Sequence, residues 1–327
     1  MEELLPYRTS YPISTFSRCC FAMNTRFSIV LVGVDQHRAD ELIDKVIHDL
    51  QEYEWLMSRF DPTSPVSDLN RHAYGNAFVP PLQLWELLLL CRHYWERTNG
   101  AFDITLCPLN CLWRKHRGRG EEPSAEAIER VWQQTGFRNI RFDSDSKTVQ
   151  FLAQGMSLDL GGFGKGFALE KVACSLRAQG VMQAFLSFGE SSITVLGSHP
   201  HGPAWPVGIT NMFRPSETVY TFQLMDASLS TSGTTPFNRM AAMRGPGSVM
   251  GQIISPQSGR PIDGYRTMSV AGASGIEAEV LSTALLVAPE QERAKVLSKF
   301  PGISAIEIAY NPSTEEHVPY IQWHYGI

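Results

Sequence analysis

The order of strand-like and helix-like segments is the feature that most limits the fold of this chain. Short β-branched runs such as Arg26–Gly33 (RFSIVLVG) stand beside long stretches such as 35–60, where apolar residues recur at helical spacing. The two kinds of segment do not alternate regularly, as they would in a doubly wound parallel fold. The sequence therefore predicts an α+β fold, with a mixed, mainly antiparallel sheet and flanking helices.

The same patterns predict further elements along the chain. A polar loop is expected from Asp61 to Asn70, and a helix is expected from the glycine-rich turn 161–166 to about Gln179. Other helices are expected at 81–98, 124–134, 276–287 and 289–299, and short strands at 139–142, 148–152, 157–160, 184–188, 193–196, 205–210, 219–224, 252–254 and 303–308.

The bulk composition excludes several classes of protein. The 327 residues are 43% hydrophobic and 19% charged, which is ordinary globular composition. The net charge of −5 argues against a nucleic-acid partner, and no apolar run approaches the roughly 20 residues of a membrane span. The N-terminus has acidic residues where a secretory signal would be basic, and it carries no lipoprotein motif, so a cytoplasmic protein is expected.

A glycine-rich turn, Ser157-Leu-Asp-Leu-Gly-Gly-Phe-Gly-Lys-Gly166, is the strongest local signal for a ligand. Closely spaced glycines let backbone amides approach an anion, and the helix that follows presents the positive end of its dipole. Lys165 can add an ammonium group for phosphate oxygens. The pattern matches neither common nucleotide-binding fingerprint, so by itself it indicates either an anion-binding turn or a tight turn without ligand.

Asp103 belongs to a second candidate cluster, Gly100-Ala-Phe-Asp-Ile-Thr105. A buried acid beside an aromatic ring can hydrogen-bond the edge of a heterocycle while the ring stacks on it. The alternative is that Asp103 only caps a turn.

Glu279, Ser282 and Thr283 form the third candidate cluster, because positions i, i+3 and i+4 share one face of a helix. Carboxylate and hydroxyl oxygens on that face could together hold a hard cation. The alternative is a solvated glutamate next to a buried serine and threonine.

These signals follow the order of the ApbE family, the FAD:protein FMN transferases, which the chain resembles over nearly its whole length. The matching segments are Met23-Asn-Thr25, Ser58-Arg-Phe-Asp-Pro62, Ser67-Asp-Leu-Asn70, Gly100-Ala-Phe-Asp103, Asp159–Gly166, Leu229-Ser-Thr-Ser-Gly233, Ile253-Ile-Ser-Pro-Gln-Ser-Gly-Arg-Pro261 and Glu279–Ala284. The resemblance implies a single ApbE-like domain at 21–327 after an N-terminal extension at 1–20. It also implies an FAD cleft between two lobes, with Mg²⁺ near the pyrophosphate.

The resemblance also implies the site residues and the reaction. FAD would contact Met23, Phe60, Ala101, Phe102, Asp103, Asp159, Lys165 and Ile253. The metal would be held by the backbone of Gly162 and by Glu279, Ser282 and Thr283, and Lys165, Gln252 and Glu279 would be the catalytic positions. Members of the family transfer FMN from FAD to a threonine or serine hydroxyl of an acceptor flavoprotein and release AMP.

The chain departs from the family pattern at a few positions. Gln252 stands where the family usually has histidine, Glu279 where it has aspartate, and Asn24 where it has glycine. A glutamine cannot take up a proton as a histidine can. Three alternatives to flavin transfer therefore stay open: hydrolysis of the FAD pyrophosphate to FMN and AMP, FAD binding or flavin supply with little turnover, and a different reaction on the same fold.

Overall fold

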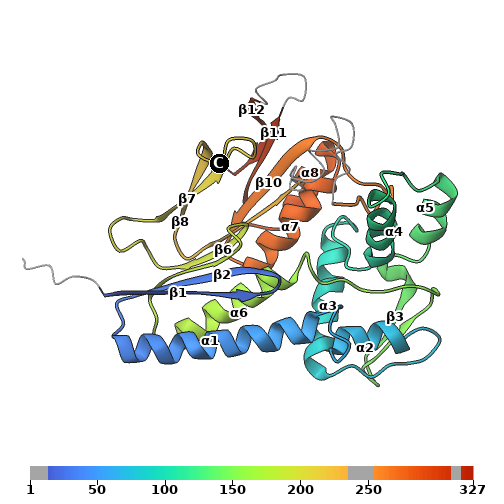
Figure 1. The fold of residues 1–327 in the computed structure, drawn as a ribbon, viewed down its shortest axis with the longest axis horizontal. Coiled ribbons are helices and arrows are strands. Elements are labelled where there is room, and N and C mark those ends of the chain that lie inside the picture. Colours follow the sequence, from blue (N-terminus) through green and yellow to red (C-terminus); the bar gives the residue numbers. More distant parts are fainter. Residues whose placement is uncertain (1–13, 235–252, 311–317, 327) are drawn as a thin grey trace, which may run out of the picture.

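An eight-stranded antiparallel sheet is the largest element of the computed structural model, which describes residues 14–234, 253–310 and 318–326 (Figure 1). Its strands lie side by side in chain order: β1 (Thr15–Ala22), β2 (Thr25–Val32), β5 (Gln183–Phe188), β6 (Ser192–Leu196), β9 (Ser228–Gly233), β10 (Tyr265–Gly272), β11 (Ser304–Tyr310) and β12 (Pro319–Tyr325). Every neighbouring pair is antiparallel. This confirms the predicted α+β fold.

The other elements are insertions between neighbouring strands of this sheet. Between β2 and β5 lie α1 (Gln36–Met57), α2 (Pro65–His72), α3 (Leu82–Arg97), α4 (Cys107–Arg117), α5 (Ala125–Trp132), the hairpin β3 (Ile140–Asp143) and β4 (Thr148–Phe151), and α6 (Gly164–Ala178). The hairpin β7 (Trp205–Thr210) and β8 (Thr218–Leu224) separates β6 from β9, and α7 (Gly275–Val287) and α8 (Glu290–Leu297) separate β10 from β11. Figure 1 shows α2 to α5 and the β3–β4 hairpin grouped beyond one end of the sheet.

The two faces of the sheet are covered by different partners. On one face, α1 and α6 bury an apolar cluster that includes Phe27, Leu50 and Leu186. On the other face, the β7–β8 hairpin buries a second apolar cluster that includes Val195 and Trp205. Burying each such side chain contributes about 1.5–3 kcal/mol. The insertions are thus fixed to the sheet by apolar packing.

No helix among the described residues is long and apolar enough to cross a bilayer.

The turn between β1 and β2 explains how asparagine fits at position 24. Met23 and Asn24 have φ of 50° and 59° and are the only two residues between the paired Ala22 and Thr25. A two-residue hairpin with both residues left-handed is a type I′ turn, in which asparagine is well tolerated. The sheet begins with β1 at Thr15, inside the segment expected as an N-terminal extension.

Several short elements differ from the sequence predictions. The expected loop 61–70 contains α2, because Ser64 caps its first turn by accepting from the backbone N–H of Ser67 and Pro65 follows at the first helical position. Helix α4 and strands β1, β9, β10 and β12 were not predicted either.

Segment 157–160 was expected to be a strand and is not one. The Asn70 side chain occupies both backbone groups of Leu158, accepting from its N–H at 2.8 Å and donating to its carbonyl at 3.1 Å. With these two groups bonded to a side chain, Leu158 has no backbone group left for a neighbouring strand. The expected strand 252–254 is also absent from the described part: Ile254 makes only a single bridge, to Pro261, and Gln252 lies outside the described residues.

Candidate functional site

A buried carboxylate on α7 is the centre of the candidate site. The Glu279 residue is only 5% exposed, and its Oε2 accepts hydrogen bonds from Ser192 Oγ (2.7 Å) and Ser230 Oγ (2.9 Å). These serines come from strands β6 and β9. The alternative of a solvated glutamate is therefore wrong, and the carboxylate is held between a helix and the sheet.

Lys165, near the N-terminus of α6, lies next to this carboxylate. Its Nζ donates to Ser191 Oγ and Ser192 Oγ, each at 2.9 Å, and is 3.4 Å from Glu279 Oε1. The structure thus brings together two predicted site residues, Lys165 and Glu279, that are 114 positions apart in the sequence.

Two features of α6 and α7 bring these side chains close. A Cβ on Gly166 would lie 2.4 Å from the carbonyl oxygen of Gly275, so only glycine allows the two helices to approach so closely. Glu170 of α6 then accepts from Ser274 Oγ and from the backbone N–H of Ile276 at the start of α7. The crossing of the two helix N-termini therefore fixes the distance between Lys165 and Glu279.

Ser282 and Thr283 complete the oxygen-rich face of α7. Ser232 Oγ on β9 lies 2.8 Å from Ser282 Oγ and 2.9 Å from Thr283 Oγ1. The described residues contain no group of three or more converging His, Cys, Asp or Glu side chains. The predicted metal set is of another kind, with one carboxylate plus hydroxyl and carbonyl oxygens, and such all-oxygen sets suit hard cations.

The glycine-rich turn is organised by Asp159. Its Oδ1 accepts from the backbone N–H of Gly161 at 2.9 Å, and its Oδ2 lies 2.7 Å from Arg59 Nε in an ion pair. Gly161 and Gly162 are exposed just before α6 begins. The turn therefore exposes its backbone to solvent at a helix N-terminus, a place where anion binding is favourable.

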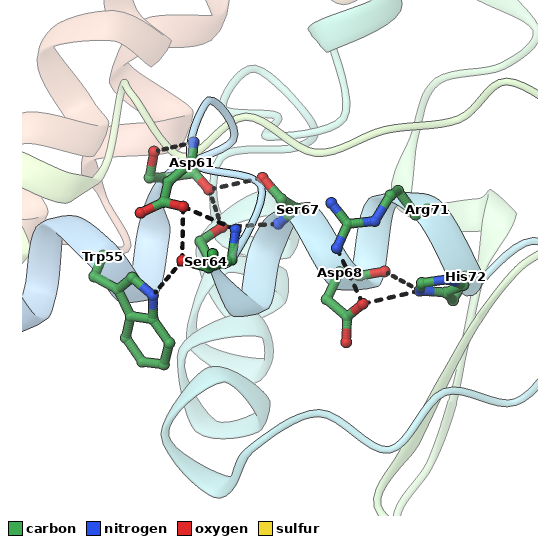
Figure 2. A network of polar contacts seen from close by, with 9 residues as sticks. Trp55, Asp61, Ser64, Ser67, Asp68, Arg71 and His72 are labelled. Atoms are coloured by element: carbon green, nitrogen blue, oxygen red, sulfur yellow. Dashed lines mark hydrogen bonds and ion pairs between the residues drawn. The ribbon is translucent and has the colours of Figure 1, made fainter.

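A network of hydrogen bonds orders the turn between α1 and α2 (Figure 2). The carbonyl of Ser58 accepts from the hydroxyls of Ser64 and Ser67, and the Trp55 indole donates to Thr63 Oγ1 at 3.3 Å. Within this turn Phe60 is 73% exposed. Its ring lies 4.1 Å from the guanidinium carbon of Arg59, so the two side chains form a cation–π pair beside Asp159.

Asp103 caps a turn, as the simpler alternative proposed. Its Oδ1 accepts from Thr105 N (2.8 Å) and Thr105 Oγ1 (2.6 Å), while burial raises the pKa of its carboxyl to about 6. Ala101 and Phe102 are buried, and the Phe102 ring packs against Phe163. In this structure the Phe102 ring faces the core.

The last two expected FAD contacts, Met23 and Ile253, are half-buried against the core. The backbone N–H of Met23 donates to Glu54 Oε2 at 2.9 Å. The loop that begins at Ile253 is fixed by two indoles, with Trp132 Nε1 donating to the carbonyl of Pro256 (2.7 Å) and Trp113 Nε1 to that of Gly259 (2.8 Å).

A model of the ApbE family matches residues 23–306. The chain belongs to the ApbE family. The curated FAD:protein FMN transferase of Salmonella typhimurium is 26% identical over 292 residues, covering 85% of this chain and 79% of that protein. These matches confirm the resemblance and assign the chain to a family of transferases.

Solved structures of ApbE proteins share the fold. The flavinyl transferase ApbE of Pseudomonas stutzeri superposes with a TM-score of 0.77 at 26% identity and covers 92% of this chain and 93% of its own. The flavin transferase ApbE of Vibrio cholerae gives a TM-score of 0.77 at 22% identity and covers 95% and 97%. The architecture is thus that of ApbE proteins along nearly the full length.

Three site residues in this ApbE-family chain, Ser192, Ser230 and Ser232, were not predicted. The sequence offered one signal for the last two, since Leu229-Ser-Thr-Ser-Gly233 belongs to the family resemblance. Because it was not recognised as a strand, the alternation that turns both serines toward α7 was missed.

Proposed function

We propose that this chain transfers FMN from FAD to a threonine or serine hydroxyl of an acceptor flavoprotein and releases AMP. The observation that carries the proposal is the convergence of Lys165 and Glu279 next to an exposed glycine turn at the N-terminus of α6. A pyrophosphate needs cationic and N–H donors around its oxygens, and this arrangement supplies both. Family membership and the name of the Salmonella typhimurium relative support the same reaction.

Magnesium is part of the proposal, because the donor set fits a hard cation. The backbone carbonyl of Gly162 and the side chains of Glu279, Ser282 and Thr283 would hold it, with Glu279 as the buried negative charge. When bound, the ion would neutralise charge that develops on the pyrophosphate during transfer. Lys165 contributes a second positive charge to the same region.

The flavin and adenine ends of FAD would lie in a cleft between the sheet and the lobe formed by α2 to α5. Phe60 supports this placement, because its exposed ring can stack on a heterocycle. Asp159 and Asp103 would accept hydrogen bonds, and Met23, Ala101, Phe102 and Ile253 would contribute the remaining contacts.

Gln252 determines how fast the transfer runs. A glutamine positions groups by hydrogen bonds but cannot accept the proton of the incoming hydroxyl. We therefore propose slow transfer with intact FAD binding. Of the three alternatives, FAD hydrolysis and FAD binding without turnover are the two that one experiment can separate from transfer.

One incubation separates these three activities. The protein is mixed with FAD, Mg²⁺ and an acceptor peptide containing a threonine, and AMP, FMN and the peptide mass are resolved over time. Transfer gives AMP and a peptide heavier by one FMN group, whereas hydrolysis gives AMP together with free FMN. Bound FAD without any AMP would leave only the binding role and refute the proposed transfer.

A further inference from the structure

Ser192 and Ser230 face each other across strands β6 and β9, and both donate to a single oxygen of Glu279. They are register partners in the antiparallel pair, are 1% and 2% exposed, and lie 2.7 Å and 2.9 Å from Glu279 Oε2. Two hydroxyl donors on Oε2 fix that oxygen against the sheet. Within the described part of the chain, the charged neighbour of the second oxygen, Oε1, is Lys165 Nζ at 3.4 Å.

Ser230 also connects Glu279 to a second oxygen of the same face. Its Oγ lies 3.2 Å from Ser282 Oγ, and Ser282 Oγ donates to the backbone carbonyl of Glu279 at 3.0 Å. A hydroxyl has a single proton, so Ser230 and Ser282 do not hydrogen-bond each other while both donate to Glu279. The two serines instead hold Glu279 from two sides, Ser230 at the carboxylate and Ser282 at the backbone carbonyl.

The length of the glutamate side chain makes these contacts possible. Its carboxyl lies one carbon–carbon bond, about 1.5 Å, further from the backbone than that of an aspartate. With the aspartate side chain on the same helix, hydrogen bonds of 2.7 and 2.9 Å would lengthen beyond bonding distance. The serine pair and the glutamate are therefore matched to each other.

We propose that Ser192 and Ser230 are positioning residues, which lock Glu279 Oε2 and leave Oε1 oriented for a divalent cation. This inference rests on the cation site of the proposed function and deepens it. Groups that hydrogen-bond a ligating carboxylate orient it, and their removal typically weakens metal binding by about 10–100-fold.

The chain contains a matched control in the same two strands. Thr194 and Ser228 are also buried register partners, with hydroxyls 2.8 Å apart. These hydroxyls bond to each other and to neither oxygen of Glu279. Replacing Ser228 by alanine therefore removes a buried hydroxyl from β9 without touching the carboxylate.

The test is a titration of the purified full-length protein with Mn²⁺, in which the free ion is measured by electron paramagnetic resonance. Mn²⁺ takes the oxygen ligands that Mg²⁺ takes. Ser230→Ala is expected to raise the Mn²⁺ dissociation constant by about 10–100-fold, with Ser192→Ala showing an effect in the same direction. Ser228→Ala should leave the dissociation constant within about twofold of wild type, since the contacts of Glu279 are unchanged.

A Glu279→Asp background distinguishes positioning from a general loss of folding. There the serines no longer reach the carboxylate, so adding Ser230→Ala should change Mn²⁺ affinity by less than about threefold. An equally large loss in both backgrounds, or equal losses for Ser230→Ala and Ser228→Ala, would overturn the positioning role while leaving the cation site intact. Failure of the wild-type protein to bind Mn²⁺ at all would overturn the cation site and this inference with it.

Discussion

Two buried glutamates, Glu279 and Glu307, are held in different ways. Glu307 on β11 is fully buried, and its two oxygens lie 2.7 and 3.3 Å from the guanidinium nitrogens of Arg293, with Arg266 at 3.3 Å as a second cation. Glu279 is almost as buried, but it accepts hydrogen bonds from two serine hydroxyls, and its charged neighbour among the described residues is Lys165 at 3.4 Å.

The difference shows which of the two carboxylates can serve a ligand. Two arginines balance the charge of Glu307 completely, and the fork geometry of Arg293 leaves little room for another cation. Serine hydroxyls orient Glu279 without neutralising it, so among the residues that the structure describes its charge is balanced by Lys165. We infer that Glu307 is structural, whereas Glu279 is part of the reaction site.

The largest expected effect is on the rate of FMN transfer. If a proton acceptor is what this site lacks, Gln252→His should raise the rate of FMN transfer by about 10²–10⁴-fold, the usual contribution of a general base. The rate of AMP release in the presence of an acceptor peptide measures this. Ser255→Asp is tested in the same background, because the ApbE pattern usually has an aspartate at this position. No gain from Gln252→His, alone or together with Ser255→Asp, would show that this region has been adapted to another acceptor or reaction.

Removing each glutamate separates the structural carboxylate from the functional one. Glu307→Ala leaves Arg293 buried without its partner and should lower the free energy of unfolding by about 3–5 kcal/mol. Glu279→Ala should cost less, about 1–3 kcal/mol, because Lys165 keeps its bonds to Ser191 and Ser192. Urea denaturation of both variants measures the difference, and an equal or larger loss for Glu279→Ala would contradict the distinction.

Asp103 is a third acid with little access to solvent. Among the described residues, no arginine or lysine forms an ion pair with it. Burial raises its folded-state pKa from 3.8 to about 6. Because the folded-state pKa is raised, the carboxyl contributes to the free energy of unfolding in full below the unfolded-state pKa of 3.8. This contribution is lost as the pH rises through the folded-state pKa of about 6.

Asp103→Asn keeps the acceptor oxygen for Thr105 but removes this titration. Between pH 4 and pH 7 the wild type should therefore lose stability relative to the variant, by about 3 kcal/mol at most, since one pKa unit corresponds to about 1.4 kcal/mol. Denaturation curves of both proteins at the two pH values test this. A constant difference between them would show that the carboxyl titrates normally.

A further prediction concerns ligand binding by Lys165, the cation beside Glu279 in the described part of the chain. Lys165→Ala should weaken FAD binding by about 1.5–3 kcal/mol, the range for a charge-assisted hydrogen bond. Because this change leaves the buried Glu279 carboxylate without its neighbouring cation, the folded state of the variant is checked by circular dichroism before the titration. Isothermal titration calorimetry with FAD gives the affinity, with FMN as the comparison ligand because FMN lacks the adenylate half. Unchanged FAD affinity would mean that the lysine only serves Glu279.

The long helices could be predicted from the sequence, whereas the serine-rich part of the site could not. Apolar residues at helical spacing define α1, α3 and α7 to within a few residues, because one face of each helix must be buried. Strand β9 has serine or threonine at four of its six positions, so its pattern shows no apolar alternation although half of its residues are buried. The partner that makes those serines favourable, Glu279, lies about 50 positions later in the chain.

The site residues also divide into those that the sequence identified and those that it did not. The resemblance to the ApbE family identified Lys165 and Glu279, and the structure brings them together. Arg59 was not predicted as a site residue, because its role depends on its ion pair with Asp159, 100 positions away. Tertiary pairs of this kind leave no periodic trace in the sequence.

The most direct test of the account is the dependence of AMP release from FAD on the Glu279 cluster and on a divalent cation. The wild-type protein should release AMP with Mg²⁺ and stop when EDTA is added, and Glu279→Ala should be inactive while still binding FAD and keeping its circular dichroism spectrum. Glu279→Asp, which retains a carboxylate ligand, should keep measurable activity. AMP release that survives either EDTA or Glu279→Ala would contradict the assignment of this cluster as the centre of the reaction.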